Sequence, residues 1–172
     1  MNEFSHAVVA EFSDVADLGE FARITVRLML AAILGFALGF ERERKGKAAG
    51  VRTHMLVAIG SAMFVLVPQL SGADPSDMSR VIQGLVAGVG FLCAGTILKQ
   101  GSGNGNANDD DEQHQVQGLT TAAGLWMTAA IGMACGLGRE TTAVLSALLA
   151  LFVLALVPRL VDVLERRFRS KR

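Results

Sequence analysis

Five long apolar stretches, separated by polar connections, dominate this 172-residue chain. They occupy residues 21–40, 53–70, 80–98, 118–137 and 141–161. A helix that crosses a membrane needs about 20 mostly apolar residues. The pattern therefore predicts an all-α membrane protein, a bundle of about five transmembrane helices. The fourth stretch depends on Ala, Gly and Thr, so we expect other helices rather than lipid to surround it.

Composition agrees with this class. Hydrophobic residues make up 51% of the chain, more than a soluble core of this size needs. The 19 glycines against three prolines favour closely packed membrane helices over a disordered chain. The formal net charge is zero, which argues against nucleic-acid binding. Cys93 and Cys135 lie in apolar stretches without CxxC spacing, so we expect both to be free.

The polar segments divide the chain into three parts. Residues 1–20 form an acidic N-terminal segment, which lacks the basic and apolar regions of a cleavable signal peptide. Residues 21–161 form the transmembrane domain, with a flexible acidic loop at 99–117. Residues 162–172 form a basic tail, which we expect to be cytoplasmic.

The distribution of Lys and Arg predicts the orientation. Twelve of the 16 Lys and Arg residues lie in three segments, namely the connections 41–52 and 99–117 and the chain from residue 159 onward. If the five spans alternate in direction, these three segments lie on the same side of the membrane. Cytoplasmic connections carry the excess of Lys and Arg, whereas carboxylates count for little. The sequence thus predicts an N-out/C-in topology.

Three runs of sequence carry a resemblance to a known family. They are RLMLAAILGFALGFERERKGKAAGVRTHMLVAIGSAMFVL at 27–66, DPSDMSRVIQGLVAGVGFLCAGTILK at 74–99 and QGLTTAAGLWMTAAIGMACGLG at 117–138. Together they resemble the MgtC/SapB family over most of the chain. The resemblance implies a bacterial inner-membrane protein linked to growth at low magnesium and, in pathogens, to virulence. It also implies a protein partner, since some members are reported to act on the F-type ATP synthase.

The chain departs from the family pattern in two places. The connection before Gly118 carries an acidic, glycine-rich insertion where relatives usually have a short basic turn. The chain also ends at Arg172, which we interpret as a short form that lacks the C-terminal cytoplasmic domain of some members.

Arg27 is the first candidate functional residue. It shares one face of its helix with Ala31, Gly35 and Gly39, a stripe of small residues that predicts a close helix contact. Three interpretations stay open. The arginine snorkels to the outer interface, forms an ion pair or carbonyl clamp within the bundle, or contributes to an ion or substrate site.

The charged connection after the first span is the second candidate. Its spacing predicts the pairs Glu41–Lys45 and Glu43–Lys47 and a C-terminal cap at Gly46. It either anchors the cytoplasmic side or forms a docking surface for a protein or anionic lipid. The family resemblance favours the docking surface, because its signature includes Glu41, Arg42, Arg44, Arg52, Thr53 and His54. His54 by itself does not predict a metal site, since no other ligand lies at the required spacing.

The connection between the third and fourth apolar stretches contains an acidic run. This run could bind Mg²⁺ weakly, because magnesium accepts a few carboxylates as ligands and retains its waters. A solvated linker is the default interpretation. The run consists of Asp109, Asp110, Asp111 and Glu112.

The remaining candidates lie within the apolar stretches. Glycines 84, 88, 90 and 95 in the third, and 132 and 136 in the fourth, predict tight helix packing. We expect Thr120, Thr121 and Thr128 to bond to their own helix or to a neighbour. Trp126 falls in mid-span, so its indole N–H is expected to need a partner within the bundle.

The sequence contains no catalytic constellation and predicts no resident cofactor, so we expect a non-enzymatic regulator or partner-binding protein. The alternative is a transporter or channel for Mg²⁺ or another cation. None of the five stretches contains Asp or Glu, which disfavours transport, although Gln83 and Thr96 offer neutral ligands. The small-residue faces also predict a homodimer.

Overall fold

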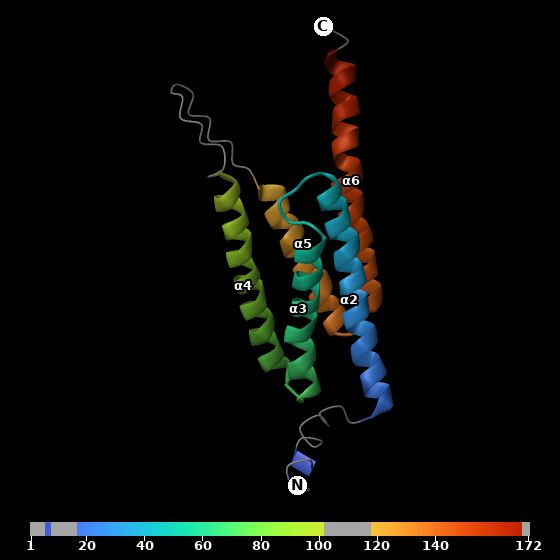
Figure 1. Cartoon of the computed structure of the whole chain (residues 1–172), viewed down its shortest axis with the longest axis vertical. Helices are drawn as coiled ribbons and strands as arrows, with labels where there is room; N and C mark the ends of the chain where they lie inside the picture. Colours follow the sequence, from blue (N-terminus) through green and yellow to red (C-terminus); the bar gives the residue numbers. More distant parts are fainter. Residues whose placement is uncertain (1–5, 8–16, 102–117, 170–172) are drawn as a thin grey trace.

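The computed structural model describes residues 6–7, 17–101 and 118–169. Five long helices lie within these ranges: α2 (Leu18–Arg44), α3 (Val51–Leu70), α4 (Pro75–Gly101), α5 (Leu119–Gly136) and α6 (Glu140–Arg169). Each is long and apolar enough to cross a membrane, which confirms the all-α prediction of five spans. The helices alternate in direction, so the chain starts at one end of the bundle and finishes at the other (Figure 1).

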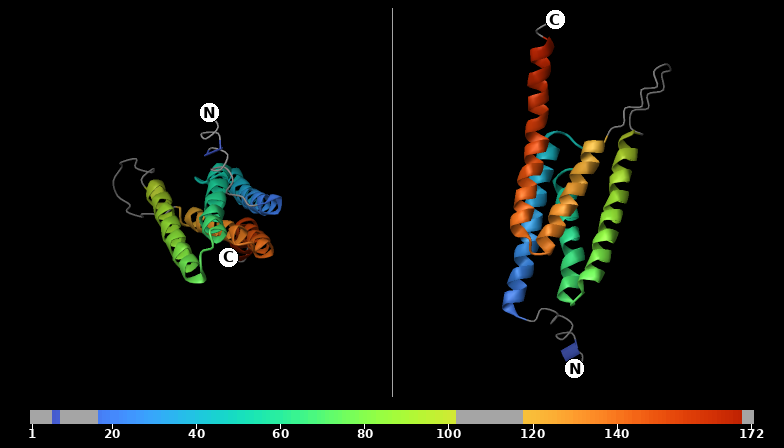
Figure 2. Two further views of the ribbon diagram at one scale, coloured as in Figure 1. Left: turned by 90° about the horizontal axis from the view of Figure 1, so that it is seen from below. Right: turned by 180° about the vertical axis from the view of Figure 1, so that it is seen from behind.

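Helix α5 lies at the centre of the bundle and contacts all four other helices. Within the bundle, 56% of its span is buried, against 11% of the span in α4. This confirms that other helices surround more of the Ala- and Gly-rich fourth stretch than of the α4 span, although one side of α5 stays exposed. Helix α4 lies at the edge, against α5 and α3, and Figure 2 shows it standing apart from α2 and α6.

Local capping sets the helix boundaries. Helix α2 begins before residue 21 because the Asp17 carboxylate accepts a hydrogen bond from the Glu20 backbone N–H at 2.6 Å. Helix α2 continues beyond residue 40 to Arg44. Gly46, just after this end, adopts a positive φ of 63°, in agreement with the predicted C-terminal cap. At the other end of the bundle, Asp74 accepts from the backbone N–H groups of Asp77 and Ser76, so α4 begins at Pro75. These hydrogen bonds, with one from the Ser76 hydroxyl, hold the pKa of the Asp74 carboxyl below its ordinary value.

Two proline-containing helices continue through their prolines. Pro68 lies inside α3, which ends at Leu70, and Pro158 lies inside α6. Helix α6 runs on to Arg169, so most of the stretch assigned to the basic tail is helical. It projects beyond the other helices (Figure 1).

Glycines allow the central helices to approach closely. A Cβ atom on Gly39 would lie 2.6 Å from the Cα of Val51, and one on Gly132 would lie 2.8 Å from the Cα of Ala58. The packing prediction is therefore confirmed for α2 and α5 against α3. It is wrong for α4 within this chain, because a Cβ on Gly84, Gly88, Gly90 or Gly95 would meet nothing within 4 Å.

Candidate functional site

A buried polar cluster lies where the C-terminal end of α2 meets α3 and α5. We call Glu41, Arg42, His54 and Thr128 the inner cluster. Arg42 is 3% exposed, His54 1% and Thr128 0%. Arg42 continues the buried stripe of α2, since it follows Gly39 by three residues. This spacing is the signal that would have identified Arg42 as a buried residue from the sequence.

The hydrogen bonds of the inner cluster fix the histidine ring. The Thr128 hydroxyl donates to the Gly124 carbonyl oxygen at 2.9 Å. Its oxygen lies 2.7 Å from Nδ1 of His54, so in this arrangement the ring N–H donates to Thr128. Nε2 of His54 is then a buried acceptor, and it has no hydrogen-bond partner among the described residues.

The charged members of the inner cluster form ion pairs. The Glu41 carboxylate lies 2.5 Å from Nζ of Lys45 and 3.6 Å from Nη1 of Arg42. The predicted Glu41–Lys45 pair is therefore present. Both carboxylate oxygens are buried without a well-directed hydrogen bond, as are Nε and Nη2 of Arg42, within the part of the chain that the structure describes. Buried polar atoms of this kind are costly unless a partner or water reaches them.

Hydrogen bonds tie the connection from α2 to α3 to the helices beside it. The Glu43 carboxylate accepts from the Val51 backbone N–H at 2.8 Å and so caps α3, rather than pairing with Lys47 as the spacing predicts. The backbone N–H groups of Lys45 and Lys47 donate to the Arg42 carbonyl oxygen. Nζ of Lys45 also donates to the Leu154 carbonyl oxygen of α6 at 2.5 Å.

Three cations of this connection are exposed. We call Arg44, Lys47 and Arg52 the basic face, and all three are exposed. The Arg44 guanidinium lies 5.8 Å from the centre of the Phe40 ring. Thr53, beside Arg52, is exposed as well. The family signature thus divides into the exposed residues Arg44, Arg52 and Thr53 and the buried or half-buried residues Glu41, Arg42 and His54.

Arg27 joins four helices at the opposite end of the bundle. Its Nη1 donates to Oε1 of Gln69 on α3 and to the Gly136 carbonyl oxygen at the end of α5, both at 3.1 Å. Its Nε lies 3.7 Å from the Glu140 carboxylate of α6. Of the three interpretations, the carbonyl clamp with an ion pair is confirmed. Gln69 and Glu140 were not predicted as partners, although both stand at helix ends on this side.

The other predicted site residues are not brought together. Gln83 and Thr120 are exposed, and Trp126 is 50% exposed rather than enclosed by the bundle. The Thr96 hydroxyl donates to the Cys93 carbonyl oxygen of its own helix at 2.8 Å, whereas Thr121 is buried. Both cysteines are free, as predicted.

The acidic run Asp109–Glu112 lies outside the described residues. Among the residues that the structure does describe, no group of three or more His, Cys, Asp or Glu side chains could hold a metal ion.

The comparisons with known proteins decide the family. The MgtC family model matches residues 28–163, which include the inner cluster and the basic face. The chain belongs to the MgtC family. No solved structure matches it.

Curated relatives support this assignment. Protein SrpB of Synechococcus elongatus is 43% identical over 125 residues, covering 70% of this chain and 66% of the relative. The putative magnesium transporter YhiD of Escherichia coli K12 is 40% identical over 140 residues, 77% of this chain and 60% of the relative. Protein MgtC of Brucella abortus is 42% identical over 135 residues, which cover 78% of this chain and 51% of the relative. This MgtC family chain therefore matches about half to two thirds of the length of these relatives.

Proposed function

We propose that this MgtC family protein is a non-enzymatic regulator of the bacterial inner membrane that binds another membrane protein during adaptation to low magnesium. Its basic face makes the contact. The F-type ATP synthase is the partner that the family resemblance suggests, and a homodimer is the proposed assembly.

The hydrogen bonds and the ion pair that brace the backbone beneath the basic face are the observation that carries this proposal. Glu43 caps α3, and Lys45 is tied to both Glu41 and α6. The exposed residues Arg44, Lys47 and Arg52 therefore stand on a backbone that these contacts brace. A surface that is ordered before binding loses less conformational entropy when the partner arrives.

The proposed orientation places the basic face in the cytoplasm and the Arg27 clamp on the outer side. The helices alternate in direction, so the α2–α3 connection and the C-terminal end of α6 lie at the same end of the bundle (Figure 1). Most Lys and Arg residues are at this end. Cytoplasmic connections of membrane proteins carry this excess.

Cation transport is the second candidate, favoured by one observation. Glu41 places a carboxylate that is only 13% exposed inside α2, past the end predicted for the span. Its two neighbouring cations already neutralise it, however, and a dication would have to displace Lys45 to bind there. The name of the Escherichia coli relative refers to magnesium transport, but it is qualified as putative.

Charge reversal on the basic face tests the docking proposal. We expect the double variant Arg44→Glu, Arg52→Glu to recover about tenfold less crosslinked partner than wild type, since each exposed charge contributes up to about 1 kcal/mol and 1.4 kcal/mol is a factor of ten. Arg42 is left unchanged, because it is buried and its loss would perturb the fold. The measurement is crosslinking from Lys47 with a membrane-impermeant reagent, followed by detection of F-type ATP synthase subunits.

The matched control is the double variant Arg80→Glu, Arg139→Glu, which reverses two exposed cations at the opposite end. It should crosslink like wild type. The reagent should act on inside-out vesicles and not on intact cells, and the topology of each variant is checked by the same labelling. Equal recovery from both double variants would contradict docking, and crosslinking from intact cells would contradict the orientation.

A further inference from the structure

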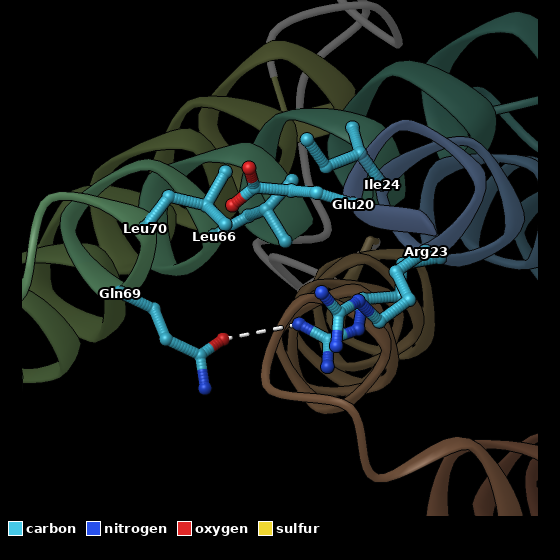
Figure 3. A pocket seen from close by; sticks show the side chains of 7 residues that line it. Glu20, Arg23, Ile24, Leu66, Gln69 and Leu70 are labelled. Atoms are coloured by element: carbon cyan, nitrogen blue, oxygen red, sulfur yellow. Dashed lines mark hydrogen bonds between the residues drawn. The ribbon is translucent and has the colours of Figure 1, made fainter. Parts of the chain in front are cut away.

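A small pocket opens beside the Arg27 clamp, between the first turns of α2 and the last turns of α3 (Figure 3). We call it the outer pocket. Its volume is about 230 Å³. Its lining residues are Glu20, Arg23, Ile24, Arg27, Leu66, Gln69 and Leu70.

The lining of the outer pocket is amphiphilic. Ile24, Leu66 and Leu70 form an apolar wall with the Glu20 carboxylate beside it, while the Arg23 guanidinium and the Gln69 amide lie on the other side (Figure 3). An apolar wall beside polar groups fits a ligand that itself has a polar head and an apolar remainder.

Arg23 supplies the positive charge that a ligand would meet. Arg27 is already engaged by Glu140, Gln69 and the Gly136 carbonyl oxygen. Arg23 is exposed and makes no ion pair or hydrogen bond among the residues that the structure describes. A planar guanidinium with free N–H groups matches the oxygens of a phosphate.

Arg23 lies near one end of a candidate membrane span, where lipid headgroups are expected. It follows the start of α2 by five residues, or about 8 Å along a helix that rises 1.5 Å per residue. The polar headgroup region occupies this depth at the end of a transmembrane helix. Pockets for drug-sized ligands measure about 300–1,000 Å³, so the smaller outer pocket suits a headgroup better than a whole metabolite.

We propose that the outer pocket binds the phosphodiester headgroup of a membrane phospholipid. The phosphate contacts Arg23, and an acyl chain follows Ile24, Leu66 and Leu70. The binding does not depend on which way the protein is oriented, because this end of α2 meets a membrane surface in either case.

Native mass spectrometry of the purified protein tests the proposal, with phosphatidylglycerol and phosphatidylethanolamine as probes. We expect Arg23→Gln to reduce lipid affinity about fivefold, since one basic residue near an anionic headgroup contributes about 1 kcal/mol. Arg80→Gln is the matched control: Arg80 is an exposed arginine at the same end that pairs with Asp77 and does not line the pocket, and its loss should leave lipid affinity unchanged.

Two further measurements separate the outcomes. Inorganic phosphate at millimolar concentration should not displace the lipid, because phosphate has no acyl chain to contact the apolar wall. Displacement would assign the pocket to free phosphate and overturn the lipid proposal. Both arginine variants should unfold at the wild-type temperature. Equal lipid affinity of Arg23→Gln and wild type would overturn the proposal as well.

Discussion

Replacing Gly132 by leucine is expected to remove most of the folded protein. A Cβ atom at this position would overlap the backbone of Ala58, lying 2.8 Å from both its carbonyl carbon and its Cα. The obstacle is main chain, so it cannot rotate away, and α5 must separate from α3 at the centre of the bundle. Overpacking costs about 1–3 kcal/mol in well-packed sites and more where backbone has to move. The measurement is the monodisperse fraction in detergent by size-exclusion chromatography.

The control for this variant is Gly84→Leu, which adds the same side chain to α4. A Cβ atom there meets nothing within 4 Å, so the monodisperse fraction should stay near that of wild type. Equal yields of the two variants would show that the contact between α5 and α3 is less tight than the structure describes.

The second large effect is expected from Arg27→Ala. The substitution removes the hydrogen bonds to Gln69 and the Gly136 carbonyl oxygen and leaves Glu140 without its partner. Hydrogen bonds to a charged group contribute about 1.5–3 kcal/mol, so we expect a stability loss of this size. Arg27→Lys should recover only part of it, because an ammonium group lacks the planar fork that reaches several acceptors.

Thermal unfolding in detergent measures this loss, with Arg80→Ala as the control. Arg80 is exposed and, among the residues that the structure describes, pairs with Asp77 three residues earlier, so its removal should change the unfolding temperature little. An Arg27→Ala protein that unfolds at the wild-type temperature would return the arginine to the snorkelling interpretation.

The membrane helices were predictable because each needs a long apolar run, whatever its neighbours. Their ends were not, because they depend on local caps. Asp17 and Asp74 start α2 and α4 three and five residues before the predicted spans. The extension of α2 to Arg44 also explains why Glu41 was counted as a connection residue.

The candidate site was predictable in part. The stripe of small residues identified Arg27 as a bundle residue, and the family signature identified the α2–α3 connection. The separation of buried Arg42 from exposed Arg44 depends on how α2 crosses α3, which the composition of the connection does not reveal. The periodicity of the stripe does contain this information, because Arg42 follows Gly35 by seven residues.

Glycine content by itself did not predict packing. Gly132 and Gly136 of α5 contact α3 closely, whereas the α4 glycines at 84, 88, 90 and 95 face open space within this chain. The same small-residue spacing occurs in both helices, and only the position of each helix in the bundle distinguishes them. Trp126 was placed wrongly for the same reason, since it lies on the outward side of α5.

Magnesium flux is the measurement that tests the central claim most directly, namely that the inner cluster anchors a docking surface and does not conduct ions. The purified protein is reconstituted in liposomes that contain a Mg²⁺-sensitive dye. We predict no uptake above empty vesicles, because Lys45 and Arg42 already pair with the Glu41 carboxylate. Saturable Mg²⁺ uptake by the wild-type protein, lost in a folded Glu41→Gln variant, would contradict this claim and make transport the function.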